Sequence, residues 1–318
     1  MEMVEHTVVL RGEAVAGGRP RPEALGRVLR YIEPVVRESV SMGFRNTSRR
    51  PGRPPQWFQQ ATDIRFVGLS AAGDEGTVLH FEAPRFAEAA GDLYRQGQLF
   101  RVRPSETDTG FDLLGDAIDD VRRGNSDSCR YDAPMLNTMH RLYGAASRGG
   151  IERVVFLGDR LREDDPVSLD EAVSSHAERM RQITPPEQRA RIAGKLDMIR
   201  DSDSVFEIIL EAGETVRGIW TPGEMADLQA FFRADVLMEG VAVYRASGML
   251  LRLEADVVSP ASARDRLFRR VPAPMARSTR APATREPQTP ASGANALFGR
   301  WPGDETEEEL LAAFEESE

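Results

Sequence analysis

The chain has 318 residues, 41% of them hydrophobic and 7% aromatic, which is enough for a sizeable core and about two domains. No run approaches the roughly 18 to 20 consecutive apolar residues of a membrane-spanning helix, and the acidic start is unlike a signal peptide. A single cysteine, Cys129, excludes an intramolecular disulfide, and the four histidines show no metal-ligand spacing. We therefore expect a soluble, cytoplasmic protein with no metal and no cofactor.

Charge is distributed unevenly along the chain. The formal net charge is -10, and residues 301–318 hold eight acids and no base. The first 300 residues are consequently close to neutral. A protein whose whole surface binds nucleic acid usually shows a basic footprint, so this class is disfavoured.

The apolar patterns of residues 1–185 predict a mixed α+β domain. They do not predict the order in which its strands pair. An amphipathic helix is predicted over 25–40, with a kink or break at Pro34. A later helix is predicted to open at Ser168 with a capping box to Glu171. The remaining predicted elements are a strand at 7–10, a β-hairpin over 64–81, helices over 111–121 and 135–143, and a strand at 151–157.

Between two of these elements, residues 45–55 form a basic loop that is rich in proline. A solvated arginine-rich loop is favoured here over an anion-binding site, because runs of like charge usually lie in solvent.

Residues 188–258 alternate apolar and polar side chains in the manner of half-buried strands. Three such strands precede a helix that opens near Thr221 and buries Met225, Leu228 and either Phe231 or Phe232, and two further strands follow it. This element order is typical of a small five-stranded OB-like β-barrel, the oligonucleotide/oligosaccharide-binding class. The predicted fold class is therefore α+β, with an N-terminal mixed α/β domain followed by this barrel.

The rest of the chain lacks a domain-like pattern. Residues 259–294 are rich in proline and arginine and predict a disordered linker. Residues 295–318 predict a partner-binding tail with a short amphipathic helix near 305–316.

The common catalytic motifs are absent, including the phosphate-binding P-loop, the dinucleotide fingerprint, the zinc-protease motif and the serine-hydrolase elbow. Two groups of acids remain as metal candidates, but a salt-bridged surface is favoured for the first and a surface turn for the second. The first group is Asp112, Asp116, Asp119 and Asp120, and the second is Asp159, Glu163, Asp164 and Asp165. We therefore expect a protein that is not an enzyme.

Large apolar side chains stand in the otherwise acidic tail, where a partner would have to cover them. Its second half is too short to form a stable helix alone, which is typical of a segment that folds on a partner. The stretch from Leu297 to Glu316, LFGRWPGDETEEELLAAFEE, resembles the C-terminal tails of bacterial antitoxins that pair with PIN-domain ribonuclease toxins. The resemblance implies that the tail binds the toxin through Leu297, Phe298, Arg300, Trp301, Leu310, Leu311 and Phe314.

The resemblance covers about 20 of the 318 residues, and nothing ahead of it matches the small DNA-binding domain of those antitoxins. The functional prediction is an antitoxin-like protein that neutralises a cognate ribonuclease toxin. The alternative is a nucleic-acid-binding adaptor that uses the OB-like domain and the basic linker, while its tail recruits a partner protein. A docking of the tail on its own domain remains open.

Overall fold

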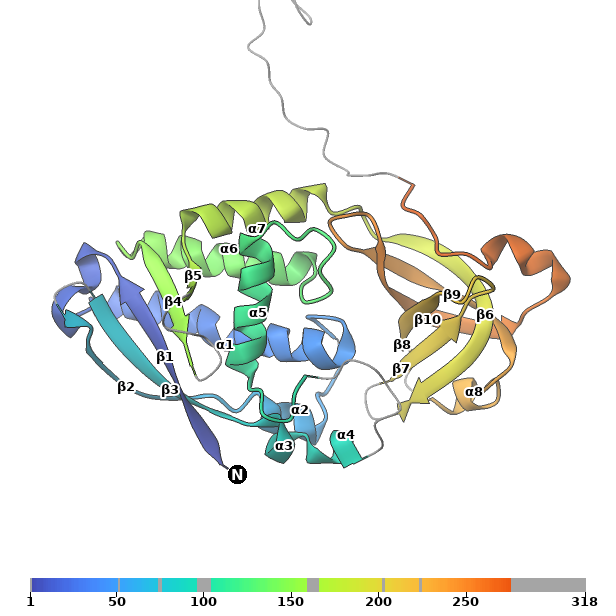
Figure 1. The fold of residues 1–318 in the computed structure, drawn as a ribbon, viewed down its shortest axis with the longest axis horizontal. Helices are drawn as coiled ribbons and strands as arrows, with labels where there is room; N and C mark the ends of the chain where they lie inside the picture. The colour runs from blue at the N-terminus through green and yellow to red at the C-terminus, as the bar shows by residue number, and fades with distance from the viewer. Residues whose placement is uncertain are drawn as a thin grey trace, which may run out of the picture. The chain divides into compact units, whose positions relative to one another are not determined.

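A computed structural model describes residues 2–50, 52–73, 76–95, 104–158, 166–201, 204–222 and 225–275. These residues build an antiparallel sheet with helices and a closed five-stranded barrel (Figure 1), so the predicted α+β class is confirmed.

The sheet has the strand order β2-β3-β1-β4-β5, and each neighbouring pair is antiparallel. β1 lies in the centre, where Val8 faces Leu79 of β3 on one side and Phe156 of β4 on the other. All three side chains are fully buried. The strands span Met3–Arg11 (β1), Arg65–Ala71 (β2), Gly76–Pro84 (β3), Arg153–Leu157 (β4) and Val167–Leu169 (β5).

Four helices of 13 residues or more pack with one another and with the sheet to form the largest hydrophobic core. They are α1 (Pro22–Arg45), α5 (Gly110–Arg122), α6 (Ala133–Ser147) and α7 (Glu171–Ile183). The shorter helices are η1 (Glu13–Gly18), α2 (Gln56–Ala61), α3 (Phe86–Ala89) and α4 (Gly91–Arg95). Within the described ranges, no helix is long and apolar enough to cross a membrane.

Two local predictions in this half are corrected. The prediction at Pro34 was a kink or a break, and a break is absent, since α1 continues through Pro34 to Arg45. Contacts with α5 and α6 hold that helix along its length, which offsets the backbone hydrogen bond that proline removes. The predicted cap at Ser168 is also wrong, since Ser168 belongs to β5 and the side chain of Asp170 caps α7 by accepting a hydrogen bond from Val173 N.

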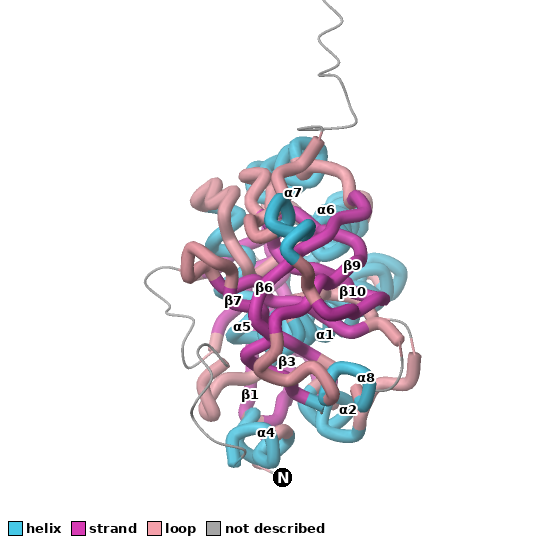
Figure 2. Tube along the Cα trace, turned by 90° about the vertical axis from the view of Figure 1, so that its right-hand side faces the viewer, coloured by secondary structure: helices cyan, strands magenta, loops and turns pink. Residues whose placement is uncertain are grey.

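The strands of the barrel (Figures 1 and 2) close in the order β10-β8-β7-β6-β9, and β10 pairs in parallel with β8. Alternate residues point inward and form a separate core that includes Ile192, Leu196 and Phe206. The predicted helix between the third and fourth strands is the short α8 (Ala226–Gln229), and Phe231 packs on the core while Phe232 is exposed. The strands span Gln188–Arg200 (β6), Val205–Ile209 (β7), Thr215–Trp220 (β8), Asp235–Tyr244 (β9) and Leu250–Pro260 (β10).

The linker does not begin at residue 259 as predicted. β10 continues to Pro260, and a 3-10 helix, η4 (Ala263–Phe268), follows it. A capping box between Ser262 and Asp265 opens this helix, and Phe268 lies under the guanidinium of Arg191 at 5.8 Å. Residues 259–275 therefore fold on the barrel, and the rest of the predicted linker lies outside the described residues.

Close approach of two strands makes Gly240 necessary in β9. A Cβ atom there would lie 2.2 Å from the carbonyl oxygen of Glu254 and 2.6 Å from Cα of Ala255, both in the backbone of β10. We expect Gly240→Ala to lower the free energy of unfolding by about 1–3 kcal/mol, because the strands would have to separate. Urea unfolding followed by circular dichroism measures this change. Gly68→Ala in β2, where a Cβ atom meets nothing within 4 Å, is the matched control, and an equal loss in both variants would contradict the packing argument.

Candidate functional site

The predicted partner-binding residues Leu297, Phe298, Arg300, Trp301, Leu310, Leu311 and Phe314 all lie outside the described residues. The second acidic group, at 159–165, does as well.

The acids of α5 take part in structural contacts. Asp112 completes the capping box of the helix by accepting hydrogen bonds from the backbone and side chain of Thr109. Asp119 pairs with Arg122 at 2.7 Å and is confirmed as part of a salt-bridged face. Asp112 and Asp120 are buried, so the prediction of a solvent-exposed face is wrong at these two residues. Over the described part of the chain, no group of three or more His, Cys, Asp or Glu side chains is arranged to hold a metal.

A buried histidine that the sequence patterns did not single out joins β1 to α5. His6 is 1% exposed, its Nε2 lies 2.9 Å from Oγ1 of Thr109, and its ring stacks on Phe111 at 4.8 Å. The Thr109 hydroxyl in turn donates to Asp112 over 2.9 Å. This histidine, threonine and carboxylate lie inside the core and cap a helix, so their contacts stabilise the fold.

The barrel face pairs its arginines with acids. Arg191 lies 3.1 Å from Glu239 and Arg217 lies 2.7 Å from Glu207. Trp220 of β8, an aromatic side chain of the kind that stacks on bases, is only 2% exposed. These pairs neutralise charge that a nucleic-acid groove would present to phosphates.

The most distinctive cavity lies instead at the C-terminal half of α1, and we call it the arginine pocket. Its volume is about 640 Å³. One stripe of α1 lines it, with residues three, four, seven and eleven positions after Pro34, which fall on one side of a helix. The loop after α1, Phe58 of α2 and Ser204, just before β7, complete the walls. The charged side chains that line it are Arg37, Glu38, Arg45, Arg49, Arg50 and Arg53.

Aromatic rings contact the guanidinium groups of two of these arginines. The Arg45 guanidinium lies 4.7 Å from the ring centroid of Phe58 and 5.1 Å from that of Trp57. The Arg37 guanidinium lies 5.3 Å from the centroid of the same Phe58 ring. Arg45 is only 5% exposed, so the expectation of a fully solvated loop is wrong at this residue.

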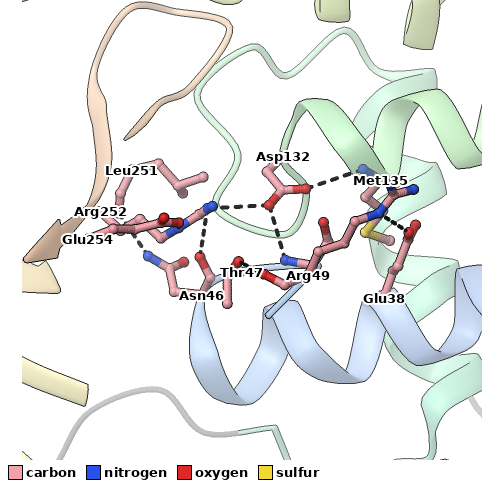
Figure 3. A network of polar contacts seen from close by, with 10 residues as sticks. Glu38, Asn46, Thr47, Arg49, Asp132, Met135, Leu251, Arg252 and Glu254 are labelled. Carbon is pink, nitrogen blue, oxygen red and sulfur yellow. Dashed lines mark hydrogen bonds and ion pairs between the residues drawn. The ribbon is translucent and has the colours of Figure 1, made fainter. Parts of the chain in front are cut away.

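A buried ion pair holds the loop of the pocket in place (Figure 3). Asp132 accepts from Arg252 of β10 over 3.3 Å, and these side chains are 1% and 5% exposed. The same carboxylate accepts from Ser48 N at 3.0 Å and from Met135 N at 3.2 Å, which caps α6. Asn46, in the left-handed conformation that ends α1, donates to the carbonyl oxygen of Leu251 over 2.7 Å. One network therefore joins the pocket loop, α6 and the barrel.

Glu38 is the acid among the described lining residues. It accepts from Arg49 Nε at 2.9 Å (Figure 3). Arg49 also donates to Thr138 over 3.2 Å. Burial raises the pKa of Glu38, and the hydrogen bonds from Thr138 and Arg49 offset only part of that rise.

This pKa shift predicts a pH dependence of stability. A carboxyl whose folded pKa is raised contributes stability that is fully present below the unfolded pKa of 4.5 and is lost as pH rises through the folded value. We therefore expect wild type to lose stability relative to Glu38→Gln as pH rises through that window. Urea unfolding of both proteins across the window measures the difference. Glu33→Gln, at an exposed position of the same helix, is the control. A wild-type stability that stays constant or rises relative to that of Glu38→Gln as pH rises through the window would contradict the assignment.

The signal for this pocket was present in the sequence as arginines at 37 and 45 on one helix face, followed by the basic loop. Pattern alone did not show that the loop folds back over that face. The chain matches no protein-family model, no curated protein and no solved structure. An interpretation of the pocket therefore depends on its own residues.

Proposed function

We propose that the chain is a non-enzymatic protein that binds and neutralises a cognate ribonuclease through the tail from Leu297 to Phe314. The single observation that supports this is the sequence of the tail, in which three large apolar residues precede an acidic turn and a short amphipathic helix pattern. Aromatic anchors in a segment that is marginal alone suit a partner groove.

The chemistry of the tail also suits a metal-dependent nuclease. Such an active site is built from carboxylates, which attract a guanidinium strongly. Arg300 is the one base in this part of the chain, between Phe298 and Trp301. In the proposal the apolar anchors supply affinity and Arg300 occupies the carboxylate-rich pocket of the nuclease.

A ribonuclease assay tests the proposal. The probe is the product of the neighbouring reading frame, incubated with a labelled RNA in the presence of the full chain or of a chain that ends at residue 294. The full chain should inhibit RNA cleavage and the shortened chain should not. Cleavage that neither chain inhibits, or that both inhibit equally, would refute a neutralising tail.

The second candidate is an adaptor that binds nucleic acid through the barrel. It is favoured by the closed five-stranded architecture, which serves oligonucleotide binding in many proteins. The paired arginines described above oppose it. Oligonucleotide binding that weakens steeply with salt and is lost on Arg191→Gln would favour this candidate over the first.

A further inference from the structure

We propose that the arginine pocket binds a small molecule that carries a diphosphate or triphosphate group. This inference is independent of the tail, because it concerns described residues of α1, α2 and the loop between them.

The charge of the pocket selects an anion. Among the described residues, five arginines and one acid line it, so these side chains carry an excess of positive charge. Like charges within one cavity repel, and an anion of several charges relieves that repulsion. Every one of these bases is an arginine, whose planar fork of N–H donors matches two phosphate oxygens at once.

The aromatic contacts prepare two of the guanidinium groups for such a ligand. The guanidinium groups of Arg37 and Arg45 both lie over the Phe58 ring, at 5.3 and 4.7 Å from its centroid. The rings therefore restrict the orientation of these side chains before a ligand arrives, which lowers the entropy lost on binding.

A buried hydroxyl gives a second indication of a ligand. Ser48 is 6% exposed and lines the pocket, yet its Oγ makes no hydrogen bond to any described residue. Its backbone N–H is fixed on Asp132 at 3.0 Å, so the residue is held firmly. A buried polar atom without a partner is costly, and a phosphate oxygen would accept from this hydroxyl.

The shape of the site favours a small molecule over a nucleic acid. A volume of about 640 Å³ falls within the range of ligand pockets for small molecules and cofactors. Nucleic acids are instead bound along extended basic surfaces that follow many phosphates. A nucleic-acid ligand is accordingly an alternative outcome of the experiment below.

Isothermal titration calorimetry of the full chain with sodium pyrophosphate, and separately with ADP, tests the proposal at constant ionic strength. Both probes should bind, and Arg37→Gln and Arg53→Gln should each weaken binding by about 10-fold or more, the effect of losing a hydrogen bond to a charged group. Ser48→Ala should also weaken binding while leaving the urea midpoint unchanged, since the hydroxyl has no partner to lose. Arg189→Gln, which removes an exposed arginine from the barrel strand β6, is the matched control and should bind as wild type does.

Three results would overturn the proposal. The first is no binding of either probe to the wild-type chain. The second is equal weakening by Arg53→Gln and Arg189→Gln, which would show that only overall charge matters. The third is a single-stranded oligonucleotide that binds more tightly than ADP and depends on Arg37 and Arg53, which would assign the pocket to nucleic acid. Arg53 is exposed, so its variant tests the pocket even if Arg37→Gln does not fold.

Discussion

Replacing Asp132 by alanine should lower the free energy of unfolding by about 3–5 kcal/mol, the cost of breaking a buried ion pair from one side. The substitution removes the buried counter-ion of the Arg252 guanidinium, which is only 5% exposed and keeps a pair at 2.8 Å with the partly exposed Glu254. It also removes the acceptor for Ser48 N and the cap of α6 at Met135 N.

Urea unfolding, followed by circular dichroism, measures this loss. Asp256→Ala is the control, because it breaks an exposed pair with Arg189 and should change stability far less. A double replacement, Asp132→Leu with Arg252→Met, should cost less than the sum of the single changes, since it removes both charges of the buried pair together. A single Asp132→Ala variant as stable as the control would show that the network does not hold the two halves together.

The barrel was the part of the fold that sequence patterns described best. Alternation along strands such as β6 records which side chains face the core, for example buried Ile192 and Leu196 beside exposed Arg191 and Lys195. Such a pattern is local and survives in one strand without knowledge of its neighbours. The order of elements then limited the closed arrangements available to five short strands.

The order of the sheet could not be predicted in the same way. β1 pairs with β4, placing Val9 opposite Val155, although most of the helical residues separate them in the chain. Nothing in the apolar pattern of either strand specifies its neighbour, because strand pairing is decided by the packing of helices and loops far away. The type of each predicted element was therefore correct, but the pairing order of the strands could not be predicted from them.

Composition misled the prediction where a local motif was overlooked. Residues after 259 are rich in arginine and proline, yet Ser262 and Asp265 have the spacing of a capping box and form one. The backbone N–H of Met275 also donates to Gln188 over 2.9 Å, which fastens this segment to β6. A linker was predicted because the composition of the whole stretch outweighed this short signal.

The arginine pocket shows a different limit. The spacing of Arg37 and Arg45 on one helix face was visible, but their stacking on Trp57 and Phe58 depends on the turn that Asn46 makes at the end of α1. A left-handed residue at that point reverses the chain and brings the loop back over the helix. A solvated loop was predicted because the sequence did not show this reversal of the chain.

In the tail, Trp301→Ala should weaken binding to the partner by about 2–4 kcal/mol, the range for a buried hot spot. Interface energy concentrates in a few aromatic side chains, and Trp301 is the largest apolar residue of the segment. Charges at the rim mainly steer association. Glu315 and Glu316 follow the last apolar anchor, Phe314, so their replacement by glutamine should cost less than about 1 kcal/mol, mostly at low salt.

Titration of the candidate ribonuclease with a peptide of residues 294–318 measures both effects. The wild-type peptide and the Trp301→Ala and Glu315→Gln peptides should be compared at two salt concentrations. The tryptophan variant should lose affinity at both, because burial of an apolar ring is only weakly screened by salt, whereas the glutamate variant should differ from wild type chiefly at the lower. Equal affinity of the wild-type and Trp301→Ala peptides would mean that the tail does not bind through its aromatic anchors. The proposal of an antitoxin-like function would then lose the observation that supports it.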